Sequence, residues 1–293
     1  FLDKHSVLVF LLPYLVLFCL FIVIPSIASV ALSFTDFNTI ELPHFVGLKN
    51  YISLLTNDTI FTRNVLPNTL IYALFVGVGG YVLSFFMAWS LSQLTKTPRT
   101  ILTVILYSPS MTGGVLLSTV WGVMFNGEKT GWLNYLLLKL QVIDEPVVWL
   151  QSEKYLMPIM ILVALWGCMG VGFLSILSGL LNINSEIYEA GYIDGIKNRF
   201  QEIVYITIPS IKPQMLFGAS MAIVGTFNSA GTGVALTGTN PTPNYAGQLI
   251  VNHIDDYGFI RHEMGYAAAV SVVVLLGVFL LTKAVGKLFV SDD

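Results

Sequence analysis

The sequence predicts an all-α membrane protein that crosses the bilayer with six transmembrane helices. Of its 293 residues, 55% are hydrophobic and only 11% are charged, whereas soluble domains carry roughly 25% charged residues. Apolar stretches longer than the ~18 residues that mark a bilayer-spanning helix recur along the chain. These stretches lack the alternating polarity of barrel strands, and lipid offers the backbone no hydrogen bonds, so we expect helices. A water-soluble enzyme is thereby excluded.

The six spans are expected at residues 7–34, 68–94, 101–125, 156–181, 214–236 and 265–282, within one transmembrane domain that covers residues 1–293. Each is long enough to cross the bilayer with some tilt. Pro13 and Pro25 predict that the first span is kinked or begins as an interfacial segment. That span begins like a signal peptide, but it is too long and lacks a small-residue cleavage site, so we expect it to be retained.

None of the six spans contains Asp, Glu, Lys, Arg or His. Transporters driven by protons or by voltage keep such groups in the membrane, so energy coupling through a buried ion pathway is disfavoured. The spans hold small residues instead, which allow helices to pack closely or to slide around a neutral substrate. The residues concerned are Gly77, Gly79, Gly80, Ser84, Gly167, Gly170 and Gly172.

Basic residues predict the orientation, because Lys and Arg are retained on the cytoplasmic side. One set of loops and ends has about 8 basic residues in ~50 positions, and the other has about 6 in ~90 positions. The richer set comprises Lys4, Lys96, Arg99, Lys197, Arg199, Lys212, Lys283 and Lys287. Both termini and the loop at residues 182–213 are therefore predicted to face the cytoplasm.

The loop at residues 182–213 predicts two short helices joined by a turn. Asn184 or Ser185 can cap the first helix, and Gly195 supplies the backbone freedom to end it. The second helix is expected from about Asn198 to Ile206, before two prolines redirect the chain into the fifth span. The loop therefore has a defined structure outside the membrane.

The first helix of this loop has a surface suited to contact with another protein. Ala190 and Gly191 leave part of it without bulky side chains, so that a partner can approach its backbone. Glu189 and Asp194 add charge to the contact. Together with Gly195, these residues form the predicted docking site.

This loop resembles the Glu-Ala-Ala loop of the permease subunits of ATP-binding-cassette (ABC) importers, particularly the maltose-type sugar permeases. The chain departs from the family pattern at Gly191, where a second Ala is usual, at Ile196, where Ala is common, and by one extra residue before Phe200. Segments 33–51 and 236–241 resemble two further parts of sugar permeases. The matching loop residues are Glu189-Ala190, Ile193-Asp194-Gly195, Phe200-Gln201, Ile206-Thr207-Ile208-Pro209 and Pro213.

The resemblance implies a type I ABC importer permease fold, in which residues 189–195 form the coupling helix that docks on a cytoplasmic ATPase. It implies four kinds of partner: a second homologous permease, an ATPase dimer that uses ATP and magnesium, an external solute-binding protein and membrane lipid. The binding protein would meet the loops at 35–67, 126–155 and 237–264. The expected location is the cell membrane of a prokaryote.

The implied activity is the import of a sugar or oligosaccharide by ATP-driven alternating access. Two alternatives stay open. The first is an ABC importer permease for another small polar solute. The second is a channel or secondary transporter outside the ABC class.

Span five contains the candidate substrate pathway, because it combines an aromatic ring, an amide, hydroxyls and small residues at membrane depth. The residues are Phe227, Asn228, Ser229 and Gly231. A buried amide must find a hydrogen-bond partner. Asn228 is interpreted in two ways, as bonding a neighbouring helix or partner subunit, or as contacting a sugar. Similarity to maltose permease places Asn228, Ser229 and Gly231 near positions that line its transmembrane sugar site.

Other chemistries find little support in the sequence. The glycine-rich stretch at 225–238 has no Gly-Lys-Ser/Thr to hold a phosphate, so the chain is expected neither to hydrolyse ATP nor to bind a cofactor. No basic cluster suits nucleic acid, and Cys19 and Cys168 predict no disulfide.

Several polar and aromatic residues are expected to have ordinary roles. The histidines lack metal-ligand spacing and predict no metal site, so surface positions are expected for His5, His44, His253 and His262. A solvated rim is expected at Asp255, Asp256 and Glu263. Interfacial anchoring is expected for Trp121, Trp132 and Trp149.

Overall fold

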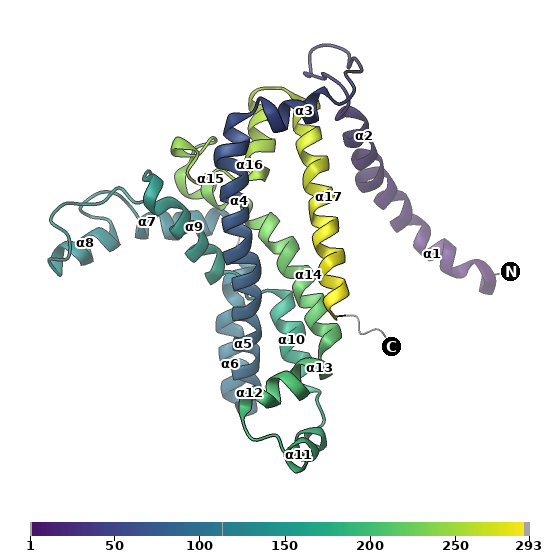
Figure 1. Cartoon of the computed structure of the whole chain (residues 1–293), viewed down its shortest axis with the longest axis vertical. Coiled ribbons are helices and arrows are strands. Elements are labelled where there is room, and N and C mark those ends of the chain that lie inside the picture. The colour runs from purple at the N-terminus through teal and green to yellow at the C-terminus, as the bar shows by residue number, and fades with distance from the viewer. Residues whose placement is uncertain (1, 113, 290–293) are drawn as a thin grey trace. The chain divides into compact units, whose positions relative to one another are not determined.

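The computed structural model of the chain consists of helices joined by loops (Figure 1). It describes residues 2–112 and 114–289, with side chains at 10–112, 118–227 and 229–287. Within these residues, the strand-like pairing is one isolated antiparallel bridge between Thr35 and Phe45. The predicted all-α class is confirmed.

Contacts divide the chain into two compact units. Unit 1 comprises Phe1–Arg63 and His253–Gly277, and unit 2 comprises Asn64–Asn252 and Val278–Asp293. The helices that lie wholly in unit 1 are α1 (Leu2–Phe18), η1 (Cys19–Val23), α2 (Ile24–Leu32), α3 (Lys49–Thr56) and η8 (Asp256–Ile260). Three helices have residues in both units, namely η2 (Phe61–Val65), α16 (Ile250–Asp255) and α17 (Met264–Phe289).

Length and apolarity identify three helices in the described residues that can cross a membrane. They are Phe10–Leu32, Phe61–Ser92 and Met264–Lys287. In the first, Pro13 lies inside α1, and the π-helical turn η1 ends just before Pro25, whose ring nitrogen has no N–H to donate. The second begins several residues earlier than predicted and contains α4 (Leu66–Tyr72), η3 (Ala73–Gly79) and α5 (Gly80–Ser92).

The other three predicted spans are interrupted, which the sequence analysis did not anticipate. The third consists of α6 (Lys96–Tyr107), the 3-10 turn η4 (Ser108–Met111) and α7 (Gly114–Met124). The fourth consists of α9 (Glu153–Trp166) and α10 (Val171–Leu181), bent by 44°. The fifth consists of α14 (Lys212–Asn228), η6 (Ser229–Gly231) and α15 (Thr232–Thr237). The count of six spans and the single domain both stay predictions.

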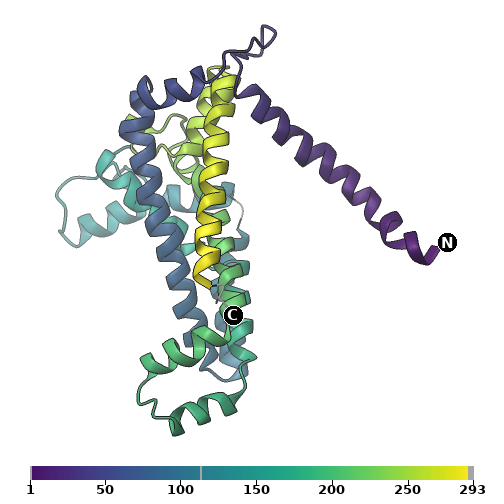
Figure 2. The same cartoon turned by 45° about the vertical axis from the view of Figure 1, so that its right-hand side comes forward.

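In unit 2, α10 packs against both α5 and α14 (Figure 2). Their shared core includes Phe85, Phe173 and Ile176, all buried. A Cβ atom added to Gly172 would lie 3.1 Å from the Cα atom of Gly218, so these two glycines let α10 and α14 approach closely. The packing role predicted for Gly172 therefore has a physical basis.

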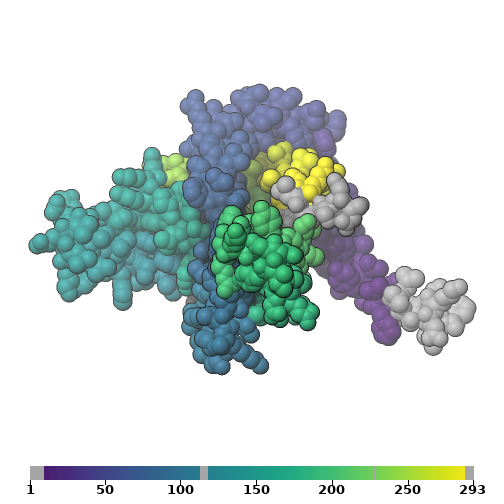
Figure 3. Space-filling view, turned by 60° about the horizontal axis from the view of Figure 1, so that its bottom comes forward, coloured from purple at the N-terminus to yellow at the C-terminus, as the bar shows by residue number. Residues whose placement is uncertain are grey.

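Between α7 and α9, unit 2 carries a lobe that contains α8 (Trp132–Lys139); it stands out in teal in the space-filling view (Figure 3). The lobe is organised around the fully buried Asn134. Its two Nδ2–H groups are shared among three backbone carbonyls at 3.0–3.2 Å, and its Oδ1 atom accepts hydrogen bonds from the Val147 amide (3.1 Å) and the Trp149 indole (2.9 Å). One amide thus satisfies five backbone and side-chain groups and fixes the lobe.

Unit 1 contains a buried polar cluster that contradicts the surface role expected for His253. The side chains of Asp58 and His253 are only 5% and 1% exposed, and His253 Nε2 lies 3.0 Å from Asp58 Oδ2. The Tyr266 hydroxyl donates to the same oxygen over 2.6 Å. Burial by itself raises the pKa of the Asp58 carboxyl, but hydrogen bonds from His253, Tyr266 and the Phe61 amide lower that pKa well below its usual range. The resulting stabilisation is present at neutral pH and is lost only as pH falls through the lowered pKa.

The solvated rim expected at Asp256 is also wrong. Asp256 is buried, and Arg261 Nη2 lies 2.8 Å from its Oδ2 atom. A buried carboxylate needs such a partner because removing the charge from water is costly. Glu263, His44 and His262 are exposed, as expected. The side chain of His5 lies outside the described residues.

Candidate functional site

Two regions of unit 2 are candidates for function, and the first is the loop between α10 and α14 (Figure 2). It contains α11 (Ser185–Ile193), α12 (Arg199–Glu202), η5 (Ile203–Thr207) and α13 (Ile208–Ser210). Asn184 caps α11 by accepting a hydrogen bond from the Glu186 amide, and Asn198 caps α12 by accepting one from the Gln201 amide. Gly195 has a φ of +102° in the turn between them, where a side chain would be strained. The predicted two-helix loop is confirmed.

One face of α11 is tied to the following segment of its own chain. This face contains Tyr188, Gly191 and Tyr192, which are neighbours on the helix surface because Gly191 and Tyr192 follow Tyr188 by three and four positions. The Tyr188 and Thr207 hydroxyl oxygens are 3.3 Å apart, and the Tyr192 hydroxyl donates a hydrogen bond to Glu202 Oε2 over 2.6 Å. Between them, a Cβ atom at Gly191 would overlap the Ile206 side chain.

The open surface expected at Gly191 is therefore wrong, because Ile206 of the same chain fills the space beside it. Glycine at this position lets α11 pack on η5. The opposite face of α11 is open, as expected for Glu189, Ala190 and Asp194, all of which are exposed. Ile193 extends this face and is 87% exposed, so it adds an apolar side chain to the open surface.

Glu202, which the sequence analysis missed, anchors the inner face. Its side chain is buried, and Arg199 Nη1 donates to both carboxylate oxygens over 2.8 and 2.9 Å. The hydrogen bond to Glu202 raises the pKa of the Tyr192 phenol, and the same carboxylate raises the pKa of Arg199. The available signal was an acid three residues after an arginine, the spacing of a helical ion pair.

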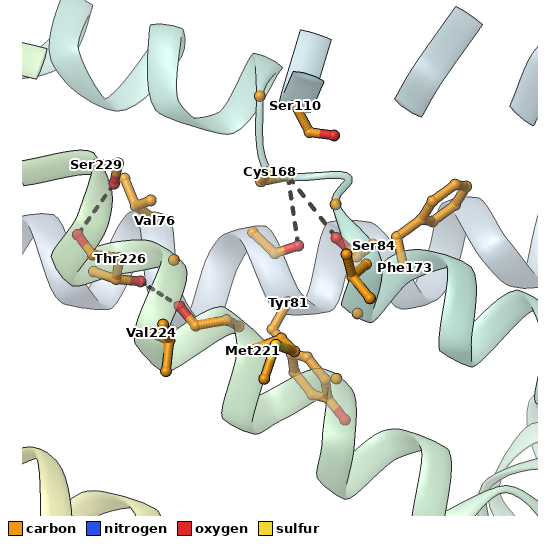
Figure 4. A pocket seen from close by; sticks show the side chains of 18 of the residues that line it. Val76, Tyr81, Ser84, Ser110, Cys168, Phe173, Met221, Val224, Thr226 and Ser229 are labelled. Carbon is orange, nitrogen blue, oxygen red and sulfur yellow. Dashed lines mark hydrogen bonds between the residues drawn. The ribbon is translucent and has the colours of Figure 1, made fainter. Parts of the chain in front are cut away.

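The second candidate is a cavity of about 380 Å³ at the points where the helices of unit 2 are irregular (Figure 4). Val76 of the π-helical segment η3 and Ser110 of η4 line it. The turn between α9 and α10 contributes Gly167 through Gly170, apart from Met169, and η6 contributes Ser229. Three irregular helical segments (η3, η4 and η6) and the turn between α9 and α10 therefore meet around one cavity.

The polar groups of this cavity are uncharged. Thr226 and Ser229 donate their hydroxyl hydrogens to the backbone carbonyls of Ala222 (2.8 Å) and Thr226 (3.1 Å), and the Tyr72 hydroxyl donates to Ser229 Oγ (3.0 Å). Ser84 and Cys168 face each other with their side-chain heteroatoms 3.9 Å apart. Among the described lining residues none carries a charge. Such a lining suits a neutral ligand with hydroxyl groups, because the hydroxyl oxygens retain acceptor capacity.

The structure brings only part of the predicted substrate pathway to this cavity. Ser229 lines it, whereas Phe227 and Gly231 are absent from its described lining. The side chain of Asn228 lies outside the described residues. Ser84, Gly167 and Gly170 were predicted only to allow close packing or sliding of helices, and Ser110 and Cys168 were not predicted to line a site. Pro109 in the middle of a span was the signal that could have located one of the breaks.

Comparisons with known proteins agree on one family. Residues 80–289 match the family described as binding-protein-dependent transport system inner membrane component. The chain is 30% identical to the arabinooligosaccharides transport system permease protein AraP of Bacillus subtilis (strain 168), over 96% of this chain and 87% of that protein. It is 27% identical to the lactose transport system permease protein LacF of Rhizobium radiobacter, over 93% of this chain and 90% of that protein.

A solved structure shares the fold. A chain of a bacterial ABC transporter involved in the import of the acidic polysaccharide alginate matches with a TM-score of 0.79 and 20% identity. The match covers 98% of this chain and 96% of that chain. At this identity the match establishes the architecture.

The buried Glu202 yields a prediction about the loop. Glu202→Ala would remove the shared partner of the Tyr192 hydroxyl and Arg199, so the loop should lose local stability. Amide hydrogen exchange across residues 185–207 should be several-fold faster. Glu189→Ala, on the exposed face of α11, is the matched control and should leave exchange unchanged. Equal exchange in the two variants would contradict the anchoring role.

Proposed function

Because this chain belongs to the family of inner membrane components of binding-protein-dependent transport systems, we propose that it is one permease subunit of an ABC importer for a sugar or oligosaccharide. The single observation that carries the substrate class is the uncharged cavity, whose hydroxyls can exchange hydrogen bonds with those of a sugar. The relatives' names support it, since they refer to arabinooligosaccharides and lactose. Alternating access would open this cavity to one side of the membrane at a time.

The breaks in the helices suit this role. A backbone that leaves the regular α-helical pattern is tolerated at membrane depth only inside protein or beside a polar cavity. At the turn between α9 and α10 and at η6, backbone groups and hydroxyls can both contact a solute. The glycine contact between α10 and α14 presents little side-chain bulk to oppose sliding of these helices.

Energy for the motion would enter through the exposed face of α11, made of Glu189, Ala190, Ile193 and Asp194, with Gly191 and Gly195 shaping the helix and its end. A cytoplasmic ATPase that binds ATP and magnesium would dock there. The inner face of α11 is fastened to α12 and η5, which lead through α13 into α14. Because α14 lines the cavity through Met221, Val224 and Thr226, a displacement of α11 would reach the solute.

The remaining assembly follows from the same proposal. A second homologous permease would complete the membrane pathway, and an external solute-binding protein would deliver the sugar to the loops at 35–67, 126–155 and 237–264. The bias of basic residues supports cytoplasmic termini and a cytoplasmic α11. Asn228, as one more residue of span five, would contact the sugar beside Ser229.

Docking can be separated from loop folding with two substitutions. Ile193→Asp places a charge on the exposed face, so we expect several-fold less ATPase to co-purify with the permease, while protease resistance of the loop is retained. Gly191→Glu should instead disrupt the loop itself, because the new side chain collides with Ile206. Normal ATPase recovery with Ile193→Asp would contradict docking on this face.

The cavity is tested by filling it. A Cβ atom added to Gly225, which lines the cavity, meets nothing within 4 Å, so Gly225→Leu should fold but obstruct the passage. Uptake per assembled complex should fall about tenfold, equal to about 1.4 kcal/mol in activation free energy. Gly122→Leu is the matched control, since Gly122 is equally open and is not part of the cavity lining. If both variants transport at the wild-type rate, the cavity is not the sugar passage.

A further inference from the structure

Helix α8 presents a row of large exposed side chains on one face. Trp132, Tyr135, Leu136 and Leu140 are 71%, 59%, 51% and 62% exposed, and their spacing of three or four residues keeps them on one side of the helix. Lys139 lies on the same side, with its Nζ atom 6.0 Å from the centre of the Tyr135 ring. We propose that this face lies on the outer surface of the membrane, with phospholipid headgroups and upper acyl chains as its partner.

The lobe holds this face outward. On the opposite side of α8, Asn134 is fully buried in its hydrogen-bond network, and Leu133 packs against a core cluster that includes Phe125. Turning the exposed row inward would break the five hydrogen bonds of Asn134. The row is therefore a fixed surface of unit 2.

Helix α8 lies about one membrane thickness away from the end of the long helix that is near α11. The cluster that Leu133 contacts also contains Tyr72, on the long helix that ends at Ser92. Ser92 lines a small cavity together with Tyr188 of α11, so the long helix ends beside the loop that carries α11. From Tyr72 to Ser92 the helix rises by about 30 Å, which is the thickness of the hydrocarbon core. In Figure 1, α8 runs across the direction of α4 and α5.

The chemistry of the row also fits lipid. Trp and Tyr concentrate at the membrane interface, where their rings meet acyl chains and their polar edges meet headgroups. Lys139 can extend its ammonium group to the phosphates while its stem stays apolar. The acidic residues of the lobe, Glu128, Asp144 and Glu145, lie before and after α8 in the sequence, whereas this face carries none. The assignment of this surface as the outer one rests on the proposed function.

The test is photo-cross-linking of the whole transporter in cell membranes. Tyr135 is replaced by the photoreactive amino acid p-benzoylphenylalanine, with a second probe at Leu136 and a matched control at the exposed Asp144. After irradiation, the permease is purified and its probe-bearing peptides are weighed by mass spectrometry. We expect phospholipid adducts at 135 and 136, several-fold above the level at 144, since Asp144 faces water.

Two results would overturn the proposal. The binding protein proposed for the loop at 126–155 would meet parts of that loop outside this row, so adducts at 135 or 136 to a binding protein or to the second permease would mean that this face of α8 is a protein interface. Equal lipid adduct at 135 and 144 would mean that the row has no preference for the membrane. Because the adduct is read without any transport step, lipid adducts in a chain that does not import sugar would reject the proposed function while supporting this inference.

Discussion

Every backbone amide and carbonyl inside a bilayer must find a hydrogen-bond partner within the protein or in enclosed water, and this constraint governs where the helices of unit 2 can be interrupted. The irregular segments at Ser108–Met111 and Ser229–Gly231, and the turn between α9 and α10, all border one cavity. A break facing lipid would leave unpaired groups, whereas a break facing a polar space leaves groups that a solute can use. The same constraint therefore makes the helices imperfect and gives the cavity its chemistry.

The loop that carries α11 shows how one short helix can serve two contacts. Tyr188, Gly191 and Tyr192 fasten it to the segment leading into α14, and this leaves the side with Glu189 and Ile193 open. In the proposed coupling, this attachment on one side of α11 would transmit a push on the other side to α14. The ion pair between the buried Glu202 and the exposed Arg199 helps to fix this attachment, because loss of Arg199 would leave the buried carboxylate without its charged partner.

Sequence reasoning predicted what depends on local pattern. The apolar runs predicted the all-α class, and capping residues such as Asn184 and Asn198 predicted both helices of the loop. Predictions from the sequence were wrong for residues whose surroundings are formed by segments far away along the chain. His253 is buried because Asp58, 195 positions away, meets it. Gly191 signalled a close approach, but a small residue does not reveal which surface approaches. The breaks at Gly167–Gly170 were interpreted as packing glycines, because glycine is compatible with either role.

In the proposed transport, the solute passes through the cavity bordered by these breaks, and the native thiol of Cys168 lines that cavity. The passage can be followed by the rate at which a small, membrane-impermeant thiol reagent modifies Cys168 in a Cys19→Ser variant of the assembled transporter. We expect this rate to change between the ATP-bound and nucleotide-free states, and we expect the transported sugar to slow it. A rate that is the same in every state, with and without sugar, would mean that the solute does not pass through this cavity.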